Sequence, residues 1–189
     1  KAVTDFPSDF SICFWKKSLD KEMPDKTFVL EDGSTELINI EVNSNVEFTV
    51  GNDTKTFYNY STEVWHHWAF IYDGTNSSMD VYRDGMNRID ETSNLSSITT
   101  STSLTGSYTM YIGGYSNQDI SPAYMEDFRI YNKALTSVEV QKTMHEFSGM
   151  TKDENLKLWY QFNNFPGDDI TVYNYASSTS PYMDGILRN

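Results

Sequence analysis

Cysteine, basic residues and long apolar runs are all scarce in this 189-residue sequence. The single cysteine excludes a framework of intrachain disulfides, and Cys13 lies in the apolar segment FSICFW, where we expect a buried thiol. Lysine and arginine together number 14 against 27 acidic residues, so the formal net charge is −13. This balance argues against nucleic acid and anionic membranes as partners, because both attract basic patches. No apolar run approaches the roughly 20 residues of a membrane helix, so membrane insertion is not expected.

Aromatic residues, by contrast, are abundant at 15% of the chain, and they alternate between positions 65 and 85. Trp68, Phe70 and Tyr72 share one parity, while Ala69 and Ile71 share the other, a pattern typical of a strand with a buried face. An Asp-Gly pair follows this strand and another follows the next apolar segment, and such pairs form tight turns. The stretch therefore predicts antiparallel strands at 66–72, 79–83 and 86–89.

Three segments resemble one family of β-sandwich domains. They are WHHWAFIYDG followed by MDVYRDG, the strand end Tyr111-Ile112-Gly113-Gly114, and MEDFRIYNKAL at 125–135. In this order they resemble the core of laminin-G-like domains, within the concanavalin A-like lectin/glucanase superfamily, over roughly residues 5–147. The resemblance implies an all-β jelly-roll sandwich of two antiparallel sheets. It does not imply one function, because this fold carries lectins, adhesion modules and hydrolase domains.

One short helix is expected, near residues 137–147. Thr136 and Glu139 form a capping box, in which the threonine hydroxyl accepts from the third helical N–H and the glutamate reaches back to the cap. Elsewhere, alternation and turn residues predict further strands at 10–16, 27–31, 37–42, 46–50, 55–60, 108–112 and 125–131.

The C-terminal segment 156–189 is in an unexpected place. A similar segment precedes the first strand in the family, so the order of the elements looks circularly permuted. We interpret residues 1–189 as a single domain and expect structural strands at 156–162 and 170–175. These strands complete their own sandwich, complete that of a neighbouring copy by strand donation, or belong to one unit of a tandem array.

No catalytic arrangement is evident, and we expect a protein that is not an enzyme. Hydrolases of this fold carry carboxylates at alternate strand positions facing one cleft. Here Glu36 and Glu41 differ in parity, and Glu126 and Asp127 are adjacent. His66-His67 are neighbours on one strand, which favours hydrogen bonding over a metal site.

Calcium is the one cofactor that the resemblance suggests. Asp5, Glu126 and Asp127 are the predicted ligands, because the family order places the closing-strand acids near the N-terminal strand and calcium prefers oxygen ligands. The 73–80 loop and Asp119 are second choices.

A glycan site needs exposed aromatic rings beside hydrogen-bonding groups. Tyr115 with Asn117 and Asp119 fits this description, and so do Tyr58 and Tyr60.

Four N-x-S/T sequons lie in or beside predicted turns and are candidate glycosylation sites: Asn52, Asn59, Asn76 and Asn94. They favour an extracellular, secreted or cell-surface protein. We therefore expect a non-catalytic recognition or adhesion module that binds a glycan or glycoprotein. The alternative is a structural subunit of an extracellular filament, bound head-to-tail to copies of itself through the C-terminal strands.

Overall fold

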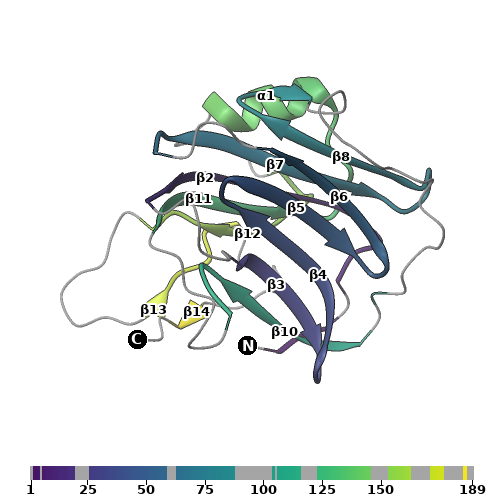
Figure 1. Ribbon diagram of the computed structural model, residues 1–189. Coiled ribbons are helices and arrows are strands. Elements are labelled where there is room, and N and C mark those ends of the chain that lie inside the picture. The colour runs from purple at the N-terminus through teal and green to yellow at the C-terminus, as the bar shows by residue number, and fades with distance from the viewer. Residues whose placement is uncertain are drawn as a thin grey trace.

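Two antiparallel sheets face each other across an aromatic core in the computed structural model (Figure 1). The structure describes residues 2–4, 6–19, 26–58, 63–87, 104, 106–115, 123–145, 153–162, 171–176 and 185–186. Within these ranges the first sheet has six strands in the order β1 (Ala2–Thr4), β10 (Ser107–Ile112), β3 (Lys26–Asp32), β4 (Thr35–Val42), β5 (Asn45–Val50) and β6 (Asp53–Tyr58). The second has six in the order β12 (Leu156–Tyr160), β11 (Ala123–Tyr131), β2 (Asp9–Ser18), β7 (His66–Asp73), β8 (Ser78–Arg83) and β9 (Met86–Asn87). This arrangement confirms the predicted β-sandwich.

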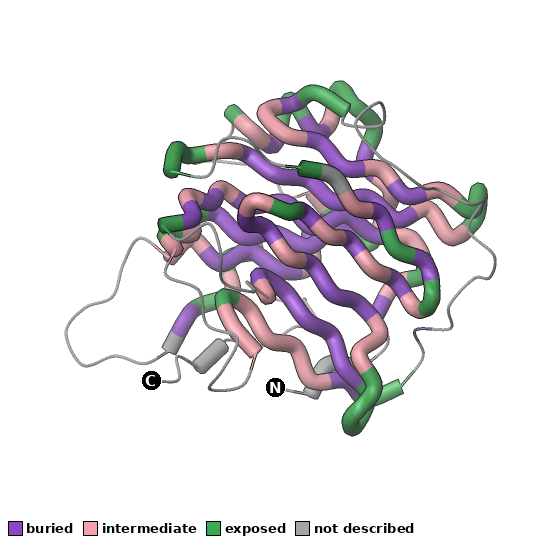
Figure 2. The backbone as a smooth tube through the Cα atoms, viewed as in Figure 1, coloured by how far each residue is buried: buried purple, intermediate pink, exposed green. Residues whose placement is uncertain are grey.

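The alternation in β7 places its large rings between the sheets. Trp68, Phe70 and Tyr72 belong to the main core, while Ala69 and Ile71 face the other side of the second sheet. Both faces of the strand are buried (Figure 2). On the outer face, Ala69 and Ile71 pack in one cluster with Leu135 and Val140, which follow β11 in the chain. The core is built largely from aromatic rings, with stacked pairs such as Phe14–Phe70, Phe14–Phe128 and Phe28–Phe128.

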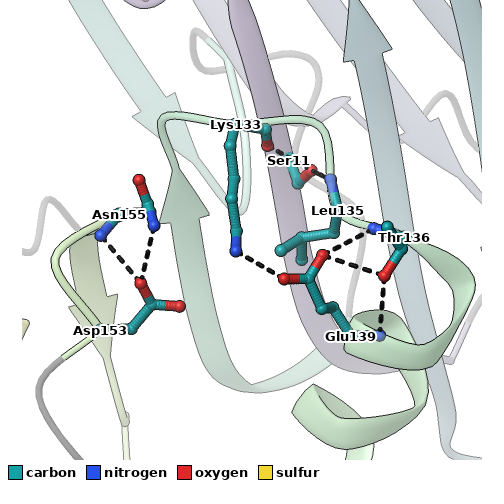
Figure 3. Close-up of polar contacts among 7 residues, drawn as sticks. All are labelled: Ser11, Lys133, Leu135, Thr136, Glu139, Asp153 and Asn155. Carbon is teal, nitrogen blue, oxygen red and sulfur yellow. Dashed lines mark hydrogen bonds and ion pairs between the residues drawn. The ribbon is translucent and has the colours of Figure 1, made fainter.

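Helix α1 (Ser137–His145) begins at the predicted capping box (Figure 3). The Glu139 amide donates to Thr136 Oγ1 at 3.3 Å, and the Thr136 amide donates to Glu139 Oε2 at 2.9 Å. Hydrogen bonds from Lys133 and Thr136 lower the pKa of Glu139. Ser11 Oγ, on β2, donates to the Lys133 carbonyl and accepts from the Leu135 amide, which ties the start of the helix to the sheet. Residues 146–147 of the predicted helix lie outside the described ranges.

Val140 fixes α1 against the outer face of the second sheet, in a small cluster with Cys13, Ala69 and Ile71 (Figure 1). Cys13 is buried as expected, and burial raises its pKa to about 12. The described part of the chain has no helix that is long and apolar enough to span a bilayer.

The first C-terminal strand extends the second sheet of the same chain. β12 pairs antiparallel with β11, with Phe128 opposite Tyr160. On the side of β12 away from β11, the Asn174 side chain makes two hydrogen bonds to the strand backbone. Its Oδ1 accepts from the Trp159 amide at 2.9 Å, and its Nδ2 donates to the Lys157 carbonyl at 3.2 Å. A separate two-stranded ladder joins β13 (Thr171–Val172) to β14 (Gly185–Ile186).

Candidate functional site

The outer face of the first sheet carries a compact group of tyrosines, acids and an asparagine. In β3 and β4, Phe28, Leu30, Ile38 and Ile40 point into the core, so the residues between them point outward. Register shifts between Lys26 and Phe28 and between Leu30 and Glu31 turn Lys26 and Glu36 to the outer face as well. We call one part of this outer surface the tyrosine face; it comprises Lys26, Glu31, Glu36, Asn39, Tyr111 and Tyr115.

Glu31 holds the two tyrosines of this face in place. The Tyr111 hydroxyl donates to Glu31 Oε1 at 2.8 Å, and the Tyr115 hydroxyl donates to Oε2 at 2.9 Å. The two rings meet edge to face, with centroids 5.2 Å apart. Donation to the carboxylate is the main reason why the pKa of Tyr115 is raised. Both rings are therefore oriented before any ligand arrives, which lowers the entropy cost of binding.

A glycine turn returns Tyr115 to the sheet after β10 ends. Gly113 has φ +78°, and a Cβ atom there would meet nothing within 4 Å. The glycine is thus required by its backbone conformation rather than by a crowded environment. The turn brings Tyr115 beside Lys26 of β3, whose Nζ lies 4.6 Å from the ring centroid and forms an ion pair with Glu36.

Asn39, in the middle of β4, has a buried acceptor without a partner. The side chain is 7% exposed, and its Nδ2 donates to Glu41 Oε1 at 3.1 Å. Its Oδ1 has no hydrogen-bond partner among the described residues. A buried polar atom left unsatisfied costs about 1–3 kcal/mol, and because this oxygen is itself buried, a ligand on the surface does not reach it directly.

The tyrosine face is part of a fold that a family comparison identifies. Residues 1–141 match the family described as the concanavalin A-like lectin/glucanases superfamily. The chain belongs to this family. A search of curated proteins finds no match to the sequence of this concanavalin A-like chain.

Solved structures share the fold at low sequence identity. A candidate carbohydrate-binding protein from Bacteroides ovatus is 14% identical with a TM-score of 0.68; the alignment covers 98% of this chain and 56% of that protein. The heptameric SAP-like pentraxin of Limulus polyphemus is 16% identical with a TM-score of 0.59, covering 79% of this chain and 73% of that one. The CBM40 domain of the Ruminococcus gnavus IT-sialidase, bound to α2,3-sialyllactose, is 12% identical with a TM-score of 0.55, covering 71% and 81%.

The structure does not bring the two predicted glycan-binding groups together. Tyr115 lies next to β10, whereas Tyr58 lies on β6 at the opposite edge of the same sheet and is 63% exposed. Four strand spacings separate β10 from β6, or roughly 19 Å. Tyr60, Asn117 and Asp119 lie outside the described residues. Glu31, Lys26 and Asn39 were missed from the sequence, although the alternation in β4 could have placed Asn39 on an outward-facing position.

In this concanavalin A-like chain, the predicted calcium ligand Asp127 is engaged by other side chains. It sits in a bulge of β11 with φ +58°, and its carboxylate pairs with Arg129 and accepts from Trp159 Nε1. Burial raises the pKa of Asp127, while Arg129 and Trp159 act in the opposite direction. Glu126 is exposed, and Asp5 lies outside the described residues.

The 73–80 loop was the second choice for a calcium site. Its Asp73 carboxylate accepts hydrogen bonds from the backbone and side-chain nitrogens of Asn76. Over the described ranges, no three His, Cys, Asp or Glu side chains are grouped to hold a metal ion. Calcium binding stays a prediction.

The two neighbouring histidines make the hydrogen bonds expected at a strand start. His66 Nδ1 lies 2.7 Å from Asp84 Oδ2, and the His67 amide donates to Asp84 Oδ1 at 3.0 Å. His67 is 2% exposed, and burial, followed by the nearby Arg129 charge, lowers its pKa to about 3. His67 is therefore neutral at physiological pH.

Two of the four sequons fall within the described residues, and both are exposed in turns. Asn52 lies between β5 and β6, and Asn76 lies between β7 and β8. Asn76 Nδ2 donates to Asp73 Oδ2 at 2.7 Å, a hydrogen bond that an attached glycan would alter. Asn59 and Asn94 lie outside the described ranges. Glycosylation stays a prediction at all four.

Proposed function

We propose that this protein is a non-catalytic carbohydrate-binding module and that the tyrosine face binds its glycan. The observation that carries the proposal is the pair Tyr111 and Tyr115, whose rings are both held by Glu31 on the outer face of the first sheet. Sugars present C–H faces that pack on aromatic rings and hydroxyls that donate and accept hydrogen bonds. The tyrosine face offers both kinds of partner within one surface.

Similar structures support a carbohydrate ligand. One is a candidate carbohydrate-binding protein, and another is a sialidase CBM40 domain bound to α2,3-sialyllactose. The chain spans 56% of the length of the first of these.

The contacts made by Glu31 and Glu36 favour glycan binding over glycan hydrolysis. Glu31 and Glu36 lie opposite each other on β3 and β4, the kind of pair that a glycosidase uses. However, both oxygens of Glu31 accept from tyrosine hydroxyls, and Glu36 pairs with the Lys26 ammonium group. These contacts engage both side chains within the protein, whereas a glycosidase needs its two carboxyl groups directed at the glycosidic bond.

The pairing of β12 with β11 of the same chain favours recognition over filament assembly, because a donated strand would have to leave this edge. Exposed sequons at Asn52 and Asn76 support an extracellular location.

A glycan array followed by calorimetry tests the proposal. The array includes α2,3-sialyllactose, lactose, cellobiose and arabinotriose. Tyr115→Ala should weaken binding of the best glycan about tenfold or more, since truncating an aromatic residue at the centre of an interface costs about 2 kcal/mol. Tyr173→Ala, an exposed tyrosine on the tail, is the matched control and should bind as the wild type does. Tyr58→Ala tests the other predicted tyrosine separately. Equal affinity of Tyr115→Ala and wild type would contradict the proposal.

A further inference from the structure

A second aromatic surface lies on the opposite side of the sandwich, where β2 ends and β7 and β11 begin. The described part of the chain exposes nine large apolar side chains. Four of them lie at this end of the second sheet: Leu19, Val64, Trp65 and Tyr124. Trp65 is 39% exposed and Tyr124 is 56% exposed. Exposed aromatic residues of this size normally mark a binding surface when they cluster, whereas isolated ones need no explanation.

The strand register places the two rings on the outer face of the second sheet. In β7, His67, Ala69 and Ile71 face outward, and Trp65 continues the same parity one step before the strand. Tyr124 of β11 is opposite Lys17 of β2, which has the outward parity of Cys13. β7 and β11 flank β2, so their backbones are roughly 10 Å apart. The ring centroids are nevertheless only 6.3 Å apart and inclined by 35°, so the rings lean toward each other across β2.

Polar groups flank this pair in a way that suits a sugar. Lys17 lies between the two strands in register, and Glu126, two residues after Tyr124 on the same face, is exposed. An ammonium group donates to hydroxyls and a carboxylate accepts from them. Trp15 and His67 lie one step further along the same face, with their rings in contact edge to face. Helix α1 packs on the face near Cys13 and Ala69, whereas Trp65 and Tyr124 at the other end of this face are exposed.

We propose that Trp65 and Tyr124 form a second carbohydrate-binding site, in which one pyranose ring packs on the two aromatic rings and its hydroxyls bond to Lys17 and Glu126. The proposal extends the carbohydrate-binding function proposed above, because it takes a ligand of the same class. The two sites lie on the outer faces of opposite sheets, so a single chain binds two glycan chains at once and cross-links them. Effective affinity for a multivalent surface then exceeds that of either site alone.

Calorimetric titration with α2,3-sialyllactose, lactose, cellobiose and arabinotriose separates the two sites. The expected stoichiometry is two glycans per chain for the wild type and one for Trp65→Ala, Tyr124→Ala or Tyr115→Ala. Trp65→Ala combined with Tyr115→Ala should bind none. Val138→Ala, which removes a side chain 72% exposed on α1, is the control and should keep both sites.

Intrinsic fluorescence gives an independent readout, because Trp65 is the exposed one of the four tryptophans: Trp68 and Trp159 are buried and Trp15 is partly buried. Glycan binding should shift the tryptophan emission in the wild type and in Tyr115→Ala, but not in Trp65→Phe. Near-ultraviolet circular dichroism shows whether Trp65→Ala folds. If it does not fold, Tyr124→Ala still tests the second site.

The outcomes distinguish this site from the tyrosine face. A single glycan per chain that is lost with Tyr115→Ala alone overturns the second site and leaves the proposed function intact. A single glycan lost with Trp65→Ala and Tyr124→Ala, but kept by Tyr115→Ala, supports the second site and overturns the tyrosine face. No heat or emission change with any of the four sugars overturns both.

Discussion

Asp127→Asn separates a structural role of this carboxylate from the predicted calcium role. Asp127 is 8% exposed and accepts from Arg129 Nε at 3.1 Å, from a second Arg129 nitrogen and from Trp159 Nε1. Arg129 is itself 1% exposed, donates to the Thr143 carbonyl of α1 at 3.0 Å, and lies over the Trp159 ring. The group thus joins β11, β12 and α1. Asparagine keeps the shape of the side chain but removes the charge and turns one acceptor into a donor that faces the guanidinium group.

The expected cost follows from leaving Arg129 buried without its counter-charge. Breaking a buried ion pair by removing one partner costs about 3–5 kcal/mol. Asparagine retains one acceptor oxygen, so we expect the lower end, about 3 kcal/mol. For a chain of this size each kcal/mol lowers Tm by about 2–4 °C, which gives a decrease of about 6–12 °C.

Thermal unfolding followed by circular dichroism, in EDTA and in excess CaCl₂, measures this effect. Glu126→Gln removes the same charge one residue away at an exposed position, and it should change stability by about 0.5 kcal/mol or less. If both acids bind calcium, CaCl₂ raises Tm of the wild type but of neither variant, because only the folded state holds the ion. Asp127→Asn melting together with the wild type in EDTA would refute the ion-pair reasoning.

Three further predictions concern the helix cap, the buried histidine and the tail. Thr136→Ala should lower the free energy of unfolding by about 1 kcal/mol in urea titrations, through loss of the helix cap; an unchanged midpoint contradicts this. His67 has its pKa lowered to about 3, so the unfolded chain takes up a proton below about pH 6.5 that the folded state does not, and stability falls on acidification. Between pH 6 and pH 4 this loss is about 2–3 kcal/mol, and His67→Gln should lack it; equal pH slopes of the two proteins in urea titrations count against the reasoning. Intact protein should sediment as a monomer at all concentrations, and fibrous or polydisperse material would instead favour strand exchange between chains. Removal of residues 156–189 should leave an unstable sandwich, because β11 would lose its partner β12.

Features that depend on neighbouring residues could be predicted from the sequence. The parity of Trp68, Phe70 and Tyr72 identified β7 and its core face, because side chains alternate along any strand. Thr136 and Glu139 identified the start of α1, since a capping box needs only residues three apart. Tyr115 could be chosen as a candidate ligand because the glycines before it predicted a turn.

The partners that define each candidate site could not be predicted in this way. Glu31 receives hydrogen bonds from tyrosines 80 and 84 residues away, and Trp65 meets Tyr124 only because β2 lies between their strands. No pattern in the sequence showed that the bulge in β11 directs Asp127, a predicted calcium ligand, toward Arg129 and Trp159.

The sequence by itself determined the strands, their buried faces and the helix cap, since periodicity and capping are properties of adjacent residues. Only the tertiary structure decided which outward-facing side chains meet, because strand order and register join residues that are distant in the chain.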